Sequence, residues 1–327
     1  MKKIVTLIIG LSLLLSMVSG AYALDDTYTV EQGDVLWKIA LDNDTTWETL
    51  AEINSLENPN LIYPGQKLQV KKAKLTNSDK AVALLESIET GDLSALAYVN
   101  PNKYIQHNLS AGDGLEGFGE LLGLLPEGSA SVNVIRVIED GDFVITHTEY
   151  NFFGPKIGFD IFRFEDGLIV EHWDNLAETS STKTPSGHTQ IDGMTQLEDL
   201  NKTSENKKLV EGFVNDILMA GKFDLLGNYF DGDAYIQHNT QVADGVSGLG
   251  SAIAAMAENG IFMVYETNHM ILGEGNFVIS VSEGTFGGVP VAYYDLFRIE
   301  NGYIAEHWDV IQEIPNQEQW QNENGKF

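Results

Sequence analysis

The feature that most constrains the fold of this chain is an internal repeat. The motif Glu171-His172-Trp173-Asp174 returns in the same order as Glu306-His307-Trp308-Asp309, 135 positions later. A second motif, Tyr104-Ile105-Gln106-His107-Asn108, returns at an offset of 131 as Tyr235-Ile236-Gln237-His238-Asn239. Two motifs that recur in order at nearly constant spacing indicate two copies of one domain. Residues 80–178 and 206–315 are therefore predicted to share one fold.

The first 23 residues have the pattern of a secretory signal peptide. Lys2 and Lys3 give a positive start, an apolar stretch runs to Val18, and Ala21-Tyr22-Ala23 is a small-residue cleavage pattern. The apolar run is shorter than the roughly 20 residues that cross a bilayer, so we expect cleavage and no stable membrane span afterwards. The alternative is a retained anchor. The signal predicts a secreted protein.

Composition narrows the range of partners. The chain has 48 acidic and 19 basic residues, a formal net charge of −29, and no cysteine. Nucleic acid attracts basic surfaces, so we expect no nucleic-acid partner. Without disulfides the domains of an exported protein depend on packing alone, for which a hydrophobic content of 43% suffices.

Residues 27–71 read as a small module of strand, helix, helix and strand. Tyr28-Thr29-Val30 alternates like a strand, helices are predicted from Val35 and over Thr46 to Ile53, and a turn leads into a last strand ending near Leu68. Polar stretches at 72–79 and 179–205 are predicted linkers, and 316–327 is a C-terminal tail.

The two ends of this module, Gly33 to Ala40 and Asn58 to Leu68, resemble a LysM domain. The resemblance implies binding to the N-acetylglucosamine glycan of peptidoglycan, and hence a cell wall-associated protein. It also implies a glycan groove between two loops, formed by Gly33, Asp34, Val35, Leu36, Asn60, Leu61 and Ile62. Val35 stands where the family usually has Thr or Ser, so one polar contact could be missing. The alternative is a scaffold without glycan affinity.

Each repeat is predicted to contain two helical segments followed by four strands. In the first repeat the strands are expected at 132–138, 143–151, 157–164 and 168–176, with turn dipeptides such as Asp166-Gly167 between them. Helices followed by an antiparallel meander predict an α+β class: two cone-shaped α+β barrels in which helices pack in a curved antiparallel sheet around a pocket.

Polar residues inside apolar strands are the candidates for chemistry. His147 and Glu149 share one face of their strand. In the last strand, alternation points either Glu171 with Trp173 or His172 with Asp174 inward, and the pattern alone does not decide. Buried His and Asp near one another can serve as general acid and base. They can equally form a hydrogen-bond network that only fixes the fold.

These motifs, together with Asp113-Gly114 and Asp160-Ile161-Phe162-Arg163, resemble the SnoaL-like polyketide-cyclase family of the ketosteroid isomerase and nuclear transport factor 2-like superfamily. The resemblance implies aldol-type cyclisation or isomerisation of a small carbonyl compound without a cofactor. The same fold also hosts dehydratases, hydrolases and plain binding domains, so the reaction does not transfer with the fold.

The candidate residues follow from both arguments. Catalytic candidates are His107, His147, Asp160, His172 and Asp174. Expected pocket residues are Tyr104, Glu149, Trp173, Tyr235, His238, Glu283, Asp295, His307 and Trp308. We expect no metal, because no histidine pair has the spacing typical of ligands. Val281 stands where the first copy has His147, so the first copy is predicted to be the better-equipped site.

Two functions therefore remain open. The chain is either a wall-attached enzyme acting on an unknown small molecule, or a non-catalytic wall-attached small-molecule-binding or assembly protein. A duplicated cone also allows the two copies to pair with each other.

Overall fold

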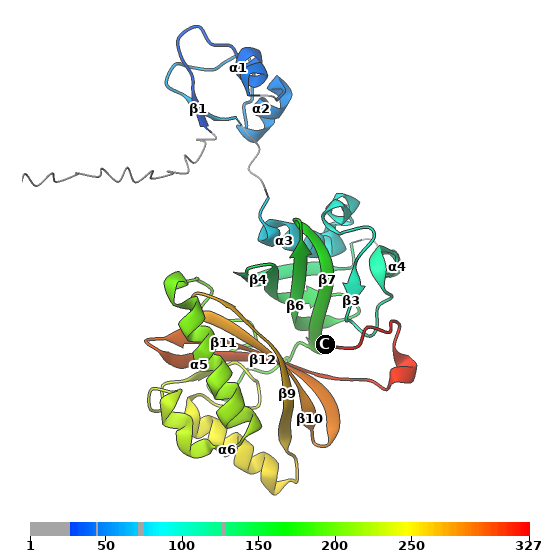
Figure 1. Cartoon of the computed structure of the whole chain (residues 1–327), viewed down its shortest axis with the longest axis vertical. Helices are drawn as coiled ribbons and strands as arrows, with labels where there is room; N and C mark the ends of the chain where they lie inside the picture. The colour runs from blue at the N-terminus through cyan, green and yellow to red at the C-terminus, as the bar shows by residue number, and fades with distance from the viewer. Residues whose placement is uncertain (1–26, 44, 71–74, 126–127) are drawn as a thin grey trace, which may run out of the picture. The chain divides into compact units, whose positions relative to one another are not determined.

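The computed structural model describes residues 27–43, 45–70, 75–125 and 128–327. The predicted signal peptide, residues 1–23, and the start of the linker at 72–79 lie outside these residues. The chain divides into two compact units, one ending at Lys74 and one running from Leu75 to Phe327 (Figure 1). None of the described helices has the length and apolar character needed to cross a membrane.

The first unit is a βααβ module. Its elements are β1 (Thr27–Thr29), α1 (Leu36–Asp42), α2 (Trp47–Ile53) and β2 (Lys67–Gln69). The two strands pair antiparallel. Thr46 caps α2 by accepting the backbone N–H of Thr49. Leu36, Leu50 and Leu68 form the centre of its core.

The second unit contains two copies of one α+β domain, which we call cone 1 and cone 2. Cone 1 comprises α3 (Asn77–Thr90), η1 (Leu93–Tyr98), β3 (Ile105–Gln106), α4 (Gly114–Leu124), β4 (Ser131–Asp140), β5 (Phe143–Asn151), β6 (Pro155–Glu165) and β7 (Leu168–Glu178). Cone 2 comprises η2 (Leu200–Lys202), α5 (Thr203–Phe213), η3 (Val214–Met219), η4 (Phe223–Asn228), β8 (Ile236–Gln237), α6 (Gly245–Glu258), β9 (Met263–Glu274), β10 (Phe277–Phe286), β11 (Val289–Glu300) and β12 (Tyr303–Glu313), and η5 (Gln317–Gln319) follows it. The predicted fold class is confirmed.

Both sheets have the same strand order, β3-β7-β6-β5-β4 in cone 1 and β8-β12-β11-β10-β9 in cone 2. The meander was predicted, whereas the short parallel strand at its edge was not. In cone 1, Ile105 pairs with Glu171 and Gln106 with His172. The two repeated sequence motifs are thus neighbours in the sheet, and side chains from both reach the same interior.

The first helix of cone 1 closes the concave face of its sheet. Thr76 and Asp79 form a capping box that starts α3, and Gly91 ends it with a φ of 68°. The buried face of α3, which includes Leu84 and Leu85, packs on inward-facing residues of the sheet.

The outward faces of the two sheets pack on each other. Phe159 and Trp173 of cone 1 and Tyr294 and Trp308 of cone 2 belong to one apolar cluster. The side-chain amide of Asn175 donates to the carbonyl oxygens of Ala292 and Val310 at 3.1 and 2.7 Å. Within residues 75–327 the cones therefore share a core.

Two connecting segments run across this pair. The linker after cone 1 contacts cone 2, where the backbone carbonyl of Thr189 lies 2.7 Å from Nδ1 of His238. The tail after cone 2 contacts cone 1, where the carbonyl of Gly325 lies 2.9 Å from Nδ1 of His107. The chain end marked in Figure 1 accordingly lies beside β7.

Candidate functional site

Cone 1 contains a cavity of about 470 Å³. Most of its wall is apolar and includes Leu84, Phe118 and Phe162. Its polar lining comes mainly from β3, β5, β6, β7 and the loop after β3: Tyr104, Gln106, Asn108, Tyr150, Asp160, His172 and Asp174. An apolar chamber with a few converging polar groups is the usual form of a small-molecule site.

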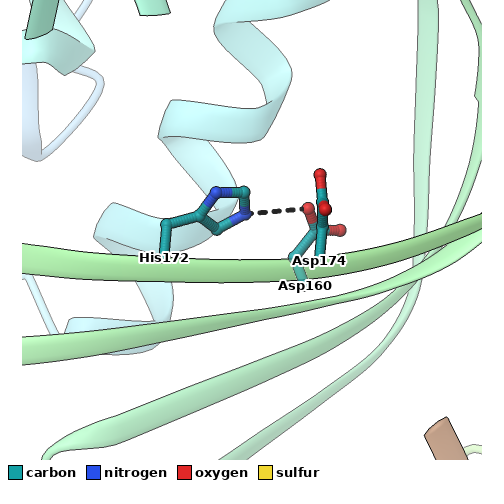
Figure 2. A group of neighbouring side chains, drawn as sticks. All are labelled: Asp160, His172 and Asp174. Atoms are coloured by element: carbon teal, nitrogen blue, oxygen red, sulfur yellow. Dashed lines mark hydrogen bonds and ion pairs between the residues drawn. The ribbon is translucent and has the colours of Figure 1, made fainter. Parts of the chain in front are cut away.

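Three buried side chains form the centre of the polar end. Asp160 of β6 lies directly opposite Asp174 of β7 in the sheet, and His172 is two residues before Asp174. Figure 2 shows the three side chains together, with Nε2 of His172 3.1 Å from Oδ1 of Asp160. The open question of alternation is thereby resolved, because His172 and Asp174 line the cavity and Trp173 joins the core between the sheets.

The hydrogen bonds of Gln106 fix the protonation of the His172 ring. The Oε1 atom of Gln106 accepts the backbone N–H of Asn108 at 2.8 Å, so this atom is an acceptor. It also lies 3.0 Å from Nδ1 of His172, which must therefore carry a hydrogen. The Nε2 atom then faces a carboxylate oxygen, and two lone pairs would repel at this distance. One proton is therefore shared between His172 and Asp160.

Each carboxylate also accepts a hydrogen bond through its Oδ2 atom. The Oδ2 atom of Asp160 accepts the hydroxyl of Tyr150, and Oδ2 of Asp174 accepts the amide of Asn108 at 2.6 Å. Burial and the nearby Asp160 raise the pKa of Tyr150 well above its ordinary value, so its phenol stays a donor. The buried Oδ1 of Asp174 has no hydrogen-bond partner within the described residues.

This arrangement provides the parts of an acid and a base. Asp174 has a carboxylate oxygen with unused acceptor capacity, and His172 with Asp160 holds a transferable proton. The side chains of Asp160, His172 and Asp174 line the same, largely apolar chamber. Proton removal at one position and donation at another are chemically accessible to such a set.

Two of the predicted catalytic histidines lie outside the cavity. His107 stacks on Trp173 with ring centres 4.8 Å apart, and its Nε2 lies 3.0 Å from Glu171. His147 accepts Nη1 of Arg136 at 3.0 Å through Nδ1 and stacks on Phe159. Strand alternation explains the placement of His147, because Thr146 and Thr148 point to the inner face of β5 and His147 points to the outer face, toward the other sheet.

Of the predicted pocket residues of cone 1, one lines the cavity and two lie on the outer face of the sheet. Tyr104 lines the cavity, whereas Trp173 lies between the sheets. Glu149 shares the outward face of β5 with His147 and accepts the amide of Asn133 at 3.3 Å. Tyr150, Gln106 and Asn108 were not predicted. Tyr150 could have been found, since it alternates with Thr148 on the face opposite His147.

Cone 2 repeats the triad. Nε2 of His307 lies 3.1 Å from Oδ1 of Asp295, and Asn239 donates to Asp309 at 2.7 Å. Tyr235 is buried, and the side-chain amide of Gln237 donates to its hydroxyl at 3.1 Å. These contacts repeat those around His172, Asp160 and Asp174.

The other residues predicted for the second pocket lie elsewhere. His238 stacks on Trp308 with ring centres 4.6 Å apart, and its Nε2 lies 2.8 Å from Glu306. Glu283 faces His269 at 3.1 Å, and both side chains are partly exposed. These three predicted residues therefore mirror His107, Trp173 and Glu149 of cone 1.

Tyrosines occupy the interior of cone 2 beside its triad. Tyr293 stands two residues before Asp295, where cone 1 has Gly158 two residues before Asp160. Tyr265 lies opposite Gly284, where cone 1 has Val132 opposite Tyr150. The two tyrosine rings stack with centres 4.1 Å apart and are buried. The hydroxyl of Tyr265 contacts Asp295 as that of Tyr150 contacts Asp160, so Tyr293 is the additional ring of cone 2.

Both triads have donor atoms of the type that holds a metal. The ligand atoms of Asp160, His172 and Asp174 lie within 4.8 Å of one another, as do those of Asp295, His307 and Asp309. One imidazole and two carboxylates suit a divalent transition metal in principle. The expectation of no metal remains a prediction.

The residues predicted to bind glycan are placed unevenly. Val35 and Leu61 are exposed, whereas Leu36 is in the core of the module. Asp34 accepts the hydroxyl of Tyr28 at 2.8 Å and the N–H of Glu31 at 2.7 Å. These bonds lower the pKa of Asp34. Of the remaining candidates, Gly33 has a φ of 97°, and Asn60 and Ile62 lie before β2.

Comparisons with known proteins identify the first module. Residues 28–71 match the LysM domain model. The chain is 44% identical over 57 residues to the "Probable endopeptidase p60" of Listeria seeligeri, a match that covers 17% of this chain and 11% of that protein. It is 48% identical over 52 residues to the N-acetylmuramoyl-L-alanine amidase sle1 of Staphylococcus saprophyticus, and this match covers 16% of this chain and 16% of that protein. The chain thus spans only about a tenth to a sixth of the length of these relatives.

The cones have likenesses among solved structures. An NTF2-like protein of unknown function from Cytophaga hutchinsonii is 15% identical, with a TM-score of 0.29. The match covers 33% of this chain and 95% of that one.

Proposed function

We propose that this chain is a secreted, peptidoglycan-attached protein whose cone 1 performs cofactor-free acid/base chemistry on a small carbonyl compound. The reaction class is aldol-type cyclisation or isomerisation. The observation that carries the proposal is the triad of Asp160, His172 and Asp174 at the end of a 470 Å³ cavity. A cavity of this volume accommodates a ligand of ordinary metabolite or drug size.

In the proposed reaction the two halves of the site act at different atoms. Asp174 removes a proton from the carbon next to the carbonyl through its carboxylate. The proton shared by His172 and Asp160 moves toward the carbonyl oxygen and stabilises the enolate. In isomerisation Asp174 returns the first proton to another carbon. In an aldol closure the enolate carbon attacks a second carbonyl, and the new alkoxide takes the proton from Asp174. In both cases the shared proton returns to His172 and Asp160 as the first carbonyl forms again.

The LysM module supports the location. LysM domains bind peptidoglycan, and the relatives that match this region are named as an endopeptidase and an amidase. The exposed Val35 and Leu61 belong to the two loops proposed to contact glycan. Export with cleavage after residue 23 would release the mature protein outside the membrane, where the LysM module could bind the wall.

The second candidate is a wall-attached binding or assembly protein without turnover. The observation that favours it is the completeness of the hydrogen bonding around the triad, where Tyr150, Asn108 and Gln106 each hold one partner. Such a network also fixes a fold. In either case we propose that the cones work as an internal pair, since their sheets share one core.

The chemistry is tested with a panel of enolisable carbonyl compounds and three forms of the full chain. These are the wild type, His172→Gln and the matched control His188→Gln, whose partly exposed ring lies beside Asp244 of cone 2. Turnover that His172→Gln reduces at least about a hundredfold, with the control unchanged, supports the proposal. Binding without turnover in the wild type supports the second candidate. Turnover that survives His172→Gln contradicts the assignment.

The location is tested by pull-down on purified peptidoglycan. A variant lacking residues 24–72 is expected to lose binding, while His172→Gln retains it. Undiminished binding by the deletion variant would show that the cones, not the LysM module, contact the wall.

A further inference from the structure

We propose that the C-terminal tail completes the site of cone 1 through Lys326, which acts as a positioning residue that holds Asp174 as a carboxylate. The effect on a reaction rests on the proposed function, whereas the ion pair itself can be measured without any substrate.

The tail is fastened to the loop that supports the triad. Asn324 donates its side-chain amide to the carbonyl of Gln106 and to Asp113, at 3.0 and 2.9 Å. Asn322 donates to the carbonyl of Asn108 at 2.8 Å. Gln106 and Asn108 are the residues that hold His172 and Asp174. The tail therefore fixes the supports of both catalytic candidates.

Lys326 lies at the end of this contact and is buried, with 6% of its surface exposed. Its Nζ donates to the backbone carbonyl of Asp174 at 2.6 Å and to Oε1 of Gln312 at 2.7 Å. The same Nζ lies 3.8 Å from Oδ1 of Asp174, the oxygen that has no hydrogen bond within the described residues. Gln312, from cone 2, also lines the cavity.

Charge explains why a buried lysine is useful here. Two buried carboxylates with one shared proton leave a negative charge in an apolar site, which burial disfavours. The Lys326 ammonium near Oδ1 of Asp174 offsets that negative charge without forming a direct hydrogen bond to this oxygen. Burial lowers the pKa of Lys326, and the nearby Asp174 opposes this effect. The ionisable groups around Asp174 are Asp160, His172, Tyr104, Tyr150, Tyr294 and Lys326.

Cone 2 shows the same site without the lysine. The linker carbonyl of Thr189 binds His238 as that of Gly325 binds His107, and the next residue is Gln190 instead of Lys326. Gln190 accepts the N–H of Ser180 at 2.7 Å. Burial raises the pKa of Asp309, and Asp295 adds to this effect. Cone 2 therefore has no lysine ammonium beside Asp309 in the place that Lys326 takes beside Asp174 in cone 1.

The ion pair is tested by NMR titration of lysine side chains in the full chain. Replacing Asp174 by Asn is expected to lower the pKa of Lys326 by at least about one unit, because an opposite charge this close shifts a pKa by 1–3 units. Asp166→Asn, on an exposed turn, is the matched control and should leave Lys326 unchanged. An unchanged Lys326 titration in Asp174→Asn overturns the proposal.

Two further measurements keep the proposal open to refutation if Asp174→Asn does not fold. In the wild type the Lys326 ammonium should give a signal protected from solvent exchange, and absence of protection refutes its burial against Asp174. For a compound that is turned over, Lys326→Met should move the acidic limb of the pH–activity profile, where Asp174 takes up a proton, to higher pH by about one unit, whereas Lys326→Arg and the exposed Lys183→Met should not. An unmoved limb refutes the positioning role. Failure of all compounds would refute the proposed reaction and leave the NMR result standing.

Discussion

Cone 1 and cone 2 share a buried triad of one histidine and two aspartates but differ in what surrounds it. Cone 1 has Gly158 and Lys326 near its triad, and a cavity of about 470 Å³ opens onto it. Cone 2 has Tyr293 and Gln190 at the corresponding positions, and Tyr293 stacks on Tyr265 beside the triad. One duplicated fold thus carries two versions of the same interior, and cone 2 has the additional buried ring of Tyr293.

The comparison teaches that the triad alone does not make a site. Its hydrogen bonds are almost the same in the two cones, with an imidazole–carboxylate distance of 3.1 Å in each. A shared structural role for the network explains its presence in both. Function in cone 1 then depends on space and charge, which the residues around the triad provide.

The largest expected effect separates the two triads by activity. Asp160→Asn should reduce turnover by about a hundredfold to ten-thousandfold, because the proton shared with His172 loses its carboxylate partner. The matched Asp295→Asn should leave turnover within about twofold. Steady-state rates on any accepted compound provide the measurement. Equal losses in the two variants would mean that both cones contribute to the reaction or that the triads only stabilise the fold.

A second effect opens cone 2. Tyr293→Ala removes a buried ring and should lower the free energy of unfolding by about 3–5 kcal/mol. The variant should also bind small apolar probes that the wild-type cone 2 does not. Denaturant unfolding and probe titration measure the two effects, with the partly exposed Tyr303→Ala as control. A loss of less than about 1 kcal/mol would show that the ring does not fill the interior.

A third effect concerns pH. Burial, reinforced by Arg136, holds the pKa of His147 well below its usual range, so the folded protein keeps this ring neutral. The unfolded chain takes up a proton as pH falls through about 6.5, and the folded form does not. Stability is therefore lost on acidification, by about 2 kcal/mol between pH 6.5 and 5 from this residue.

The variant His147→Val carries the residue found at Val281 in cone 2 and should remove this part of the pH dependence. Unfolding at several pH values measures the slope, and His269→Gln is the surface control. A slope unchanged in His147→Val would contradict a neutral buried His147.

The smallest expected effect separates the two repeated tryptophans. Nε1 of Trp308 donates to the carbonyl of Asp192 at 2.9 Å, whereas Nε1 of Trp173 has no hydrogen-bond partner in the described part of the chain. Trp308→Phe should therefore cost about 1 kcal/mol more than Trp173→Phe in unfolding free energy. Equal costs would show that the bond from Trp308 adds nothing to stability.

Much of the fold followed from the sequence because it depends on periodicity. The duplicated motifs predicted two copies, and the alternating strands with Asp166-Gly167 predicted the meander, since both are local signals. The two-residue strand at Ile105 was too short to show a period. Tertiary pairing is what makes it a strand.

The candidate site was harder to predict because it depends on which face of a strand points inward. Alternation grouped His172 with Asp174 but could not choose between that pair and Glu171 with Trp173. His147 looked suitable for catalysis only because the sequence did not show that a second sheet covers its face. Lys326 is about 150 residues from Asp174 in sequence, and only the packing of the tail brings them together.

The central claim is that ligand enters cone 1 and not cone 2. Its most direct test is an NMR titration that follows the ring signals of His172 and His307 in the full chain while a carbonyl compound from the active panel is added. The account predicts saturable movement of the His172 signals with those of His307 unchanged. Movement of His307 while His172 stays unchanged would contradict it.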